Sequence, residues 1–486
     1  MQTISQLEQI PPEVLLMILG YLPRHCLLPL RLVSKFLSNH VTSLVFSYLS
    51  LDFNHLDQGA FHRNLCWTHD VKRDPASSLS SLTDGLASLP NLKNLRIRIE
   101  FPNSYGLDPD LPPLHPFKHL SGLDISSSHN LPATYWENEV RTVVKSSVEL
   151  SSFSLVLDKG HKAPPPSVQT IIGEGPRTKL ERLVLKNVAL PPPGLHSFCT
   201  KNLKHLTIST SPGPRAPAVA WSCIWSALRD IGVELLSLSV PVYGEEVDSM
   251  FNYLLSYSGL RELEITKVQM ETELPEDAAG EVFWNAVVPR HKDSLIDLVV
   301  SPVYEGSWCY DQPAANAIRQ CTSLKRLCLR LSLTGDSWFN DEMMRMKENN
   351  DVKFSEQDQG VWESSRCYLA LLILKYGSEA TLLEKLVVDI ANPASRREMD
   401  MGHLRRGTRP KGSRDLYELR SQMRQNLSEL ETALCSLQLP YDAGQGWPVI
   451  ELGNGVVLRW REHVAREDPC NTLATSKYGC YEVVSA

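Results

Sequence analysis

Cysteine and histidine are the residues of this sequence best suited to supply a nucleophile, a general base or metal ligands. The eleven cysteines are dispersed from Cys26 to Cys480 without a C-x-x-C pair, and the fourteen histidines contain no H-E-x-x-H spacing. An odd, dispersed set of cysteines is typical of reduced thiols in the cytosol or nucleus. The sequence also lacks a G-x-S-x-G nucleophile turn and a P-loop. We therefore expect no catalytic site, no metal and no cofactor.

The bulk composition excludes several classes of protein. The chain has 486 residues, 42% of them hydrophobic and 22% charged, which allows a sizeable folded core. Its formal net charge of −7 argues against a nucleic-acid-binding or membrane-surface role, because either role needs a basic face. No apolar run approaches the roughly 20 residues of a membrane span, and Glu8 and Glu13 lie where a secretory signal would be basic. We expect a protein of the cytoplasm, the nucleus or both, without nucleic-acid or membrane partners.

The N-terminal segment predicts a helix that is apolar on every side. Residues 14–22 read V-L-L-M-I-L-G-Y-L, with Pro12 just before them and Pro23 as the stop. Two shorter helical patterns follow, so the whole unit has roughly 40 residues, which is too few to bury such a helix completely. Part of its apolar surface should therefore belong to an interface.

These residues carry a family resemblance. I-P-P-E-V-L-L-M-I-L-G-Y-L-P at residues 10–23, followed by L-L-P-L-R-L-V-S-K-F at residues 27–36, resembles the F-box; Ile10 replaces the usual leucine and Phe36 the common tryptophan. The resemblance implies docking to the Skp adaptor of Skp–cullin–F-box ubiquitin ligases. By position, the candidates for that interface, or for the core of the module itself, are Ile10, Pro11, Val14, Leu15, Ile18, Leu19, Leu27, Leu30 and Val33. The alternative is a helical hairpin that packs only against the rest of this chain.

A repeat occupies the middle of the chain. The pattern L-x-x-L-x-L, with other apolar residues allowed, begins at residues 92, 120, 150, 180, 203, 235, 260, 295, 324 and 383. Helical patterns lie in many of the spacers, and a strand followed by a helix buries both apolar faces when the units stack side by side. This resembles the helix-backed form of the leucine-rich repeat, without the family's buried asparagine three places after each strand pattern. A doubly wound α/β domain is the alternative, although no glycine-rich phosphate loop follows any strand.

The predicted fold class is α/β, with three parts. Residues 1–50 form a three-helix F-box that binds the adaptor, and residues 51–395 form a degenerate leucine-rich-repeat solenoid of parallel strands backed by helices, with long loop insertions. Residues 396–486 contain a basic linker, a helix at about 413–438, a β-hairpin at residues 449–452 and 456–460, and a loose tail beyond Pro469. The helix would cap the solenoid, or alternatively form a coiled-coil contact in a dimer.

Loops after three neighbouring strands carry aromatic residues that would meet on one rim of the sheet. Such a cluster suits the recognition of a protein partner, and its candidate members are Tyr243, Tyr304, Trp308, Tyr310 and Trp338. The alternative is that each ring anchors its own loop to the solenoid.

The sequence thus predicts a non-catalytic substrate-recognition subunit of an Skp–cullin–F-box ubiquitin ligase. The expected partners are an Skp-family adaptor, a cullin held through it, and a protein substrate that the sequence does not identify. Two alternatives remain: an adaptor-bound F-box scaffold acting outside a cullin ligase, and a plain leucine-rich-repeat interaction protein.

Overall fold

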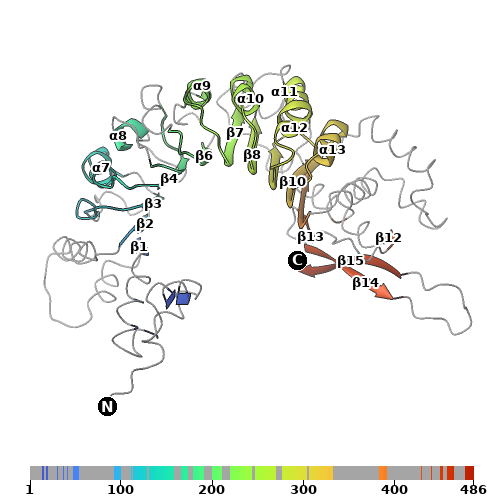
Figure 1. Cartoon of the computed structure of the whole chain (residues 1–486), viewed down its shortest axis with the longest axis horizontal. Helices are drawn as coiled ribbons and strands as arrows, with labels where there is room; N and C mark the ends of the chain where they lie inside the picture. Colours follow the sequence, from blue (N-terminus) through green and yellow to red (C-terminus); the bar gives the residue numbers. More distant parts are fainter. Residues whose placement is uncertain are drawn as a thin grey trace, which may run out of the picture. The chain divides into compact units, whose positions relative to one another are not determined.

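The structure is a computed structural model of the whole chain (Figure 1). It describes residues 14, 15, 18, 19, 30, 37, 41, 48–53, 92–99, 111, 113–128, 131–157, 166–172, 179–190, 200–210, 219, 221–243, 247–269, 276–303, 306–331, 383–390, 428, 439–440, 449–452, 457–464 and 477–485. The chain divides into two compact units, Met1–Val233 and Glu234–Ala486.

The first unit contains a parallel sheet whose strands follow one another in chain order. Its strands are β1 (Tyr48–Phe53), β2 (Asn94–Ile99), β3 (Gly122–Ser127), β4 (Ser152–Leu157), β5 (Arg182–Lys186) and β6 (His205–Ser209). Its helical segments are α6 (Ala133–Tyr135), η2 (Trp136–Val140), α7 (Arg141–Ser146), α8 (Val168–Ile172) and α9 (Trp221–Ile231). In Figure 1, α7 and α8 lie on one side of these strands, so the opposite face of the sheet carries no described helix.

The apolar residues of the repeat pattern form the core of this unit, because the strand register aligns them from one strand to the next. Leu95 of β2 pairs with Leu123 of β3, which pairs with Phe153 of β4, and the row continues through Leu183 and Leu206. All five are at most 2% exposed. Because side chains alternate across a strand, the residues between these positions face away from the helices. The repeat therefore builds a buried face and a solvent face on every strand.

The second unit repeats this arrangement. Its parallel strands are β7 (Ser237–Tyr243), β8 (Glu262–Gln269), β9 (Asp297–Pro302), β10 (Arg326–Leu331) and β11 (Lys385–Ile390). Its helical segments are α10 (Val247–Leu255), α11 (Glu276–Val282), η5 (Phe283–Val287), α12 (Val288–Arg290) and α13 (Gln312–Arg319). The N-terminus of α13 is capped by Asp311, whose Oδ1 accepts a hydrogen bond from the Ala314 N–H at 3.0 Å.

A mixed set of strands follows β11. β13 (Val449–Leu452) continues the parallel ladder on β11, and β14 (Val457–Val464) pairs with it in the antiparallel direction. β15 (Lys477–Ser485) pairs antiparallel with β14 and with β12 (Leu439–Pro440).

The α/β class and all ten predicted repeat strands are confirmed, and so is the hairpin between β13 and β14. Two strands differ from the expectation. β1 was not predicted, and β15 lies in the tail that was expected to be loose, where the hydrogen-bonding edge of β14 gives the segment a partner. The predicted helix at residues 413–438 lies outside the described residues, except for Ser428, which is helical.

One buried asparagine lies near the place where the repeat pattern lacks one. Asn187 follows β5 with a positive φ of 57° and is 6% exposed. Its Nδ2 donates to the carbonyl oxygen of Leu157 at 2.6 Å, and its N–H donates to the carbonyl oxygen of Ser209. It lies one residue before the place where the family pattern would put an asparagine.

Candidate functional site

The first helix of the N-terminal module has a buried side and an exposed side. Val14, Leu15, Ile18 and Leu19 are all helical. Leu15 and Leu19 are 2% and 3% exposed, whereas Val14 and Ile18 are 40% and 46% exposed. Positions four apart lie on the same side of a helix, so each pair forms a stripe. The structure thereby separates residues that the sequence could not divide.

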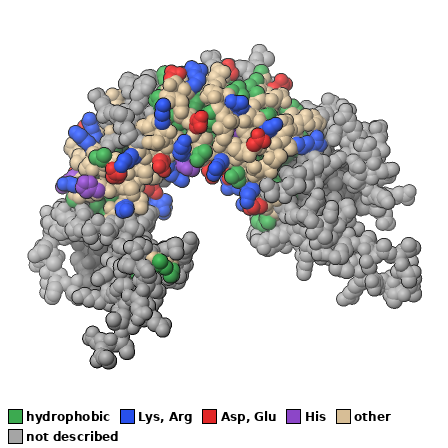
Figure 2. Space-filling model, in the orientation of Figure 1, with side chains coloured by type: hydrophobic (Ala, Val, Ile, Leu, Met, Phe, Trp, Pro, Cys, Tyr) green, Lys and Arg blue, Asp and Glu red, His purple; other side chains and the backbone are tan. Residues whose placement is uncertain are grey.

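The exposed stripe is unusual for this chain. Among the described residues, the large hydrophobic side chains that remain exposed are Val14, Ile18, Val148 and Val282. Two of these four lie side by side on one helix, which makes a continuous apolar surface rather than an isolated contact with water. Figure 2 shows hydrophobic atoms at the surface of the N-terminal region, and further hydrophobic atoms scattered among charged and polar groups over the rest of the visible described surface.

The other predicted adaptor residues are only partly described. Leu30 is helical and half-buried. Ile10, Pro11, Leu27 and Val33 lie outside the described residues. The adaptor-binding role of all nine residues stays a prediction, and the exposed stripe indicates which of them could touch a partner without unfolding the module.

Two members of the predicted aromatic cluster, Trp308 and Tyr310, are buried in the structure. Trp308 and Tyr310 are 3% and 6% exposed. The Trp308 ring lies 6.1 Å from that of Phe251 and 5.0 Å from that of Phe283, measured between ring centroids. In this arrangement the two side chains are not available to a partner, as the alternative of loop-anchoring rings expects.

The side chains of the other three aromatic candidates are not described. Tyr243 ends β7, where its backbone pairs with Gln269, and its side chain is not described. Tyr304 and Trp338 lie outside the described residues. A substrate-binding role for these positions stays a prediction.

Local hydrogen bonds explain why Trp308 turns inward. The Trp284 Nε1–H donates to the carbonyl oxygen of Ser307 at 3.1 Å, and the Cys309 N–H donates to that of Gly306 at 2.9 Å. Gly280 on α11 lies so close that an added Cβ would meet the Ser307 carbonyl carbon and oxygen at 2.7 Å. The turn at residues 306–310 is therefore held against the helices of the unit.

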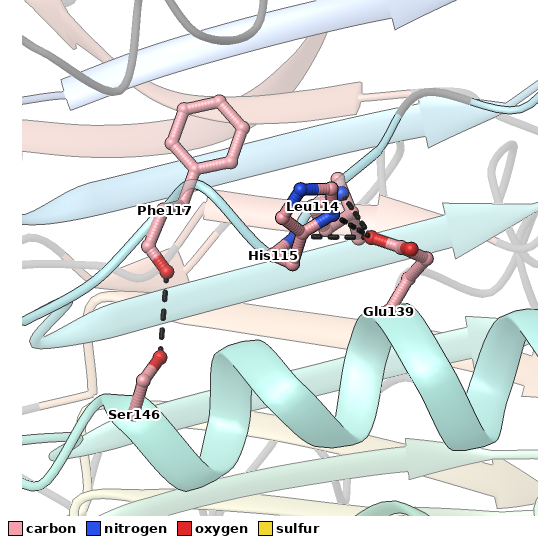
Figure 3. Close-up of polar contacts among 5 residues, drawn as sticks. All are labelled: Leu114, His115, Phe117, Glu139 and Ser146. Atoms are coloured by element: carbon pink, nitrogen blue, oxygen red, sulfur yellow. Dashed lines mark hydrogen bonds and ion pairs between the residues drawn. The ribbon is translucent and has the colours of Figure 1, made fainter. Parts of the chain in front are cut away.

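A carboxylate holds the segment that leads into β3 (Figure 3). Glu139 on η2 accepts hydrogen bonds from the N–H groups of Leu114 at 2.6 Å and His115 at 3.0 Å, and from His115 Nδ1 at 3.2 Å. Ser146 Oγ donates to the Phe117 carbonyl oxygen at 3.4 Å. Burial raises the pKa of Glu139, but these donors outweigh it, and the net pKa lies below the usual value. This contact fixes the end of the loop that follows β2.

The solvent face of the sheet in the second unit carries paired charges. Arg326 lies 2.9 Å from Asp297 across β9 and β10, and Arg330 lies 3.1 Å from Asp389 across β10 and β11. One strand further, Lys385 contacts Glu451 at 2.5 Å. Sequence reasoning missed these outward positions because they fall on the variable places of the repeat pattern.

The described residues offer no arrangement for catalysis by a metal. No group of three or more His, Cys, Asp or Glu side chains among them could hold a metal ion. None of the helices in the described part of the chain is long and apolar enough to cross a lipid bilayer.

Comparison with known proteins identifies the N-terminal module. Residues 7–49 match the family model of the F-box domain. The match contains all nine predicted adaptor residues and ends inside β1. No curated protein matches the chain.

Proposed function

Because the chain carries an F-box domain ahead of a leucine-rich-repeat-like parallel sheet, we propose that it is the substrate-recognition subunit of an Skp–cullin–F-box ubiquitin ligase. Residues 1–50 bind an Skp-type adaptor and, through it, a cullin. Residues 51–395 bind the protein substrate, and residues 396–486 close the far end of the repeats. The chain has no catalytic step of its own; it raises the effective concentration of substrate lysines near the ubiquitin-loading machinery.

The exposed stripe of Val14 and Ile18 is the observation that supports this proposal most directly. A monomer gains nothing from two apolar side chains in water, whereas an adaptor groove would bury them. Complete burial of a valine or isoleucine side chain contributes about 1.5–3 kcal/mol. Since both are already about half covered, their burial in an interface should add about 1 kcal/mol each.

A co-purification experiment tests the adaptor contact. We would co-express the whole chain with an Skp-family adaptor and compare the native chain with Val14→Asp. A carboxylate placed in an apolar interface costs several kcal/mol, which is enough to abolish a micromolar complex. We expect the variant to lose the adaptor while its circular dichroism spectrum stays native.

The matched control is Val282→Asp in the second unit. Val282 is 43% exposed and Val14 40%, so the two substitutions place the same charge at equally exposed valines. The control should keep the adaptor. Leu15→Asp is unsuitable because Leu15 is 2% exposed, and the change would test folding rather than binding. Retention of the adaptor by folded Val14→Asp and Ile18→Asp would overturn the proposed contact surface.

A second measurement separates a ligase receptor from an adaptor-bound scaffold. Purified complex is mixed with cullin, a ubiquitin-conjugating enzyme and a bound partner protein, and ubiquitin transfer to that partner is followed. Transfer that depends on the native Val14 side chain supports a receptor. Adaptor binding without cullin assembly or transfer would favour the scaffold.

A further inference from the structure

The solvent face of the second unit's sheet has an apolar centre. Val299 on β9, Cys328 on β10 and Val387 on β11 lie side by side in the strand register and alternate with the buried side chains of their strands. Val299 is 8% exposed, and the other two are half-buried. In Figure 1, α10, α11 and α13 lie on the other side of these strands, so no described helix covers this face. We call the three residues the apolar row.

Cys328 belongs to this row as a neutral side chain. Burial raises the pKa of its thiol, against the opposing effects of a hydrogen bond with Ser301 and of nearby arginine charges. A protonated thiol packs like a small hydrophobic group. The row therefore forms a continuous apolar strip across three strands.

Charged side chains border the apolar row on two sides. Asp297 lies 2.9 Å from Arg326 on the side where the strands begin. Arg330 lies 3.1 Å from Asp389 on the side where the strands end. Each of these pairs is neutral as a whole. An apolar centre within a polar rim is the usual composition of a protein interface.

The charge at the β8 end of the row is not neutralised. Glu264 is the register neighbour of the first residue of the row, and Glu262 is that of Asp297. Glu264 Oε2 accepts a hydrogen bond from Ser239 Oγ at 2.7 Å, but neither glutamate forms an ion pair with a described residue. Burial raises the pKa of Asp297, and the charges of the two glutamates raise it further, against the opposing effect of Arg326. The excess negative charge at this end favours a cationic group on a partner.

The spacing of the row indicates the form of that partner. Neighbouring strands are about 4.8 Å apart, so Glu264 lies about 14 Å from Val387, three strands away. Side chains at positions i, i+3, i+7 and i+10 of an α-helix are separated by about 4.5, 6 and 4.5 Å along its axis. Alternate residues of an extended segment are about 6.8 Å apart, which does not match the strand spacing. A helix that lies across the strands therefore fits the row better than an extended segment.

We propose that this face docks an amphipathic helix of the substrate, with apolar side chains at i, i+3 and i+7 on the apolar row and a basic side chain at i+10 that faces Glu262 and Glu264. This inference rests on the proposed receptor function and names the chemistry of the segment it recognises. The C-terminal turn of the helix lies at the β8 end, where the helix dipole also favours a cation.

A peptide-binding experiment tests the helical form and the charge. The adaptor-bound full chain is titrated into fluorescein-labelled peptides, and anisotropy gives Kd. The first peptide has about 18 residues, mostly alanine and glutamine, with leucine at i, i+3 and i+7 and arginine at i+10. A second has glutamine in place of the arginine. A third has the composition of the first with the leucines distributed around the helix, and a fourth has a proline at i+5, which breaks the helix.

The charge contact is tested at Glu262, which is exposed. Glu262→Lys should weaken binding of the first peptide at least about fivefold and leave binding of the glutamine peptide unchanged. Glu281→Lys is the matched control, because Glu281 is also an exposed glutamate of the second unit but lies on α11, on the helical side of the sheet. Equal binding by native and Glu262→Lys chains, or an equal loss with Glu281→Lys, would overturn the inference.

The apolar contact is tested at Val387. Val387→Gln should weaken binding of the first and second peptides alike, by about fivefold. Val184→Gln is the matched control, because Val184 is a half-buried, outward-facing valine of β5 in the first unit. Equal binding by native and Val387→Gln chains would overturn the inference. Circular dichroism verifies folding, and the exposed Glu262 still provides a test if Val387→Gln does not fold.

The remaining outcomes separate the form of the ligand and the two proposals. Equal binding of the peptide with distributed leucines, or of the proline peptide, would refute a helix that lies along the row. Adaptor co-purification is measured on the same samples, so failure of peptide binding with the adaptor retained refutes the docking inference alone. Loss of the adaptor with peptide binding retained refutes the receptor proposal alone.

Discussion

Acidification should destabilise the second unit through His291. The residue caps the end of α12 and is 1% exposed. Its Nδ1 accepts a hydrogen bond from the Leu260 N–H at 3.4 Å, and its ring lies 5.2 Å from that of Tyr257. Burial lowers the pKa of His291 from 6.5 to about 4; the Leu254 backbone opposes the change, and the Arg290 charge adds to it.

The sign follows from where the proton binds. The unfolded imidazole takes up a proton as the pH falls through 6.5, whereas the folded one stays neutral until about pH 4. The unfolded state therefore binds more protons between these values, and the free energy of unfolding falls as the pH falls. From the two pKa values, the loss is about 2 kcal/mol at pH 5 and approaches about 3 kcal/mol below pH 4.

His291→Asn isolates this contribution from all other titrating groups. Asparagine keeps an acceptor near the position of Nδ1 but does not titrate. Urea unfolding would be followed by tryptophan fluorescence, since Trp284 and Trp308 lie in the same unit. Between pH 7.5 and pH 5, the variant should lose about 2 kcal/mol less than the native chain. Equal losses in the two proteins would refute the assignment of a neutral, buried imidazole.

Substitutions at three further positions test individual contacts, each by urea unfolding. Gly280→Ala should destabilise the protein by about 1–2 kcal/mol, because overpacking against the Ser307 backbone outweighs the gain in helix propensity; a more stable variant would contradict this. Glu139→Gln should cost about 1–2 kcal/mol at neutral pH. Because the pKa of Glu139 is lowered in the folded state, the ionised carboxylate stabilises the protein above the ordinary carboxyl pKa, and this stabilisation is lost as the pH falls through the folded value. The difference in unfolding free energy between the native chain and Glu139→Gln should therefore shrink in acid. A difference that stays constant with pH would argue against this role of Glu139. Asn187→Gly should cost about 1 kcal/mol for the lost hydrogen bond, and Asn187→Ala about 2 kcal/mol, because alanine also disfavours the positive φ; the reverse order would show that backbone conformation is unimportant there.

Most of the fold is predictable because the leucine pattern has a direct physical meaning. Each L-x-x-L-x-L motif determines which side chains of its strand face the core. Neighbouring strands then pair with equivalent motif positions side by side, as Leu95 pairs with Leu123. β1 carries the same motif as Phe46-x-x-Leu49-x-Leu51, but its phenylalanine and the helical pattern just before it hide the match. β15 has no such motif, so only its pairing with β14 defines it.

The candidate sites are less predictable, for a different reason in each case. A helix that is apolar all round gives no sign that Leu15 turns inward and Ile18 outward, because only the packing of neighbouring helices decides. An aromatic residue in a loop, such as Trp308, has the same sequence appearance whether it is exposed or packed. Val299, Cys328 and Val387 are visible as outward positions, but their alignment in one row depends on strand pairing across 29 and 59 positions of the chain.

Tyr48 and Leu49 belong both to the F-box match and to β1, which pairs with β2 from Tyr48↔Asn94 to Phe53↔Ile99. The F-box match therefore runs into the first strand of the sheet with no linker segment between them. No truncation point leaves both the F-box match and β1 whole, so the chain cannot be divided there into two intact fragments.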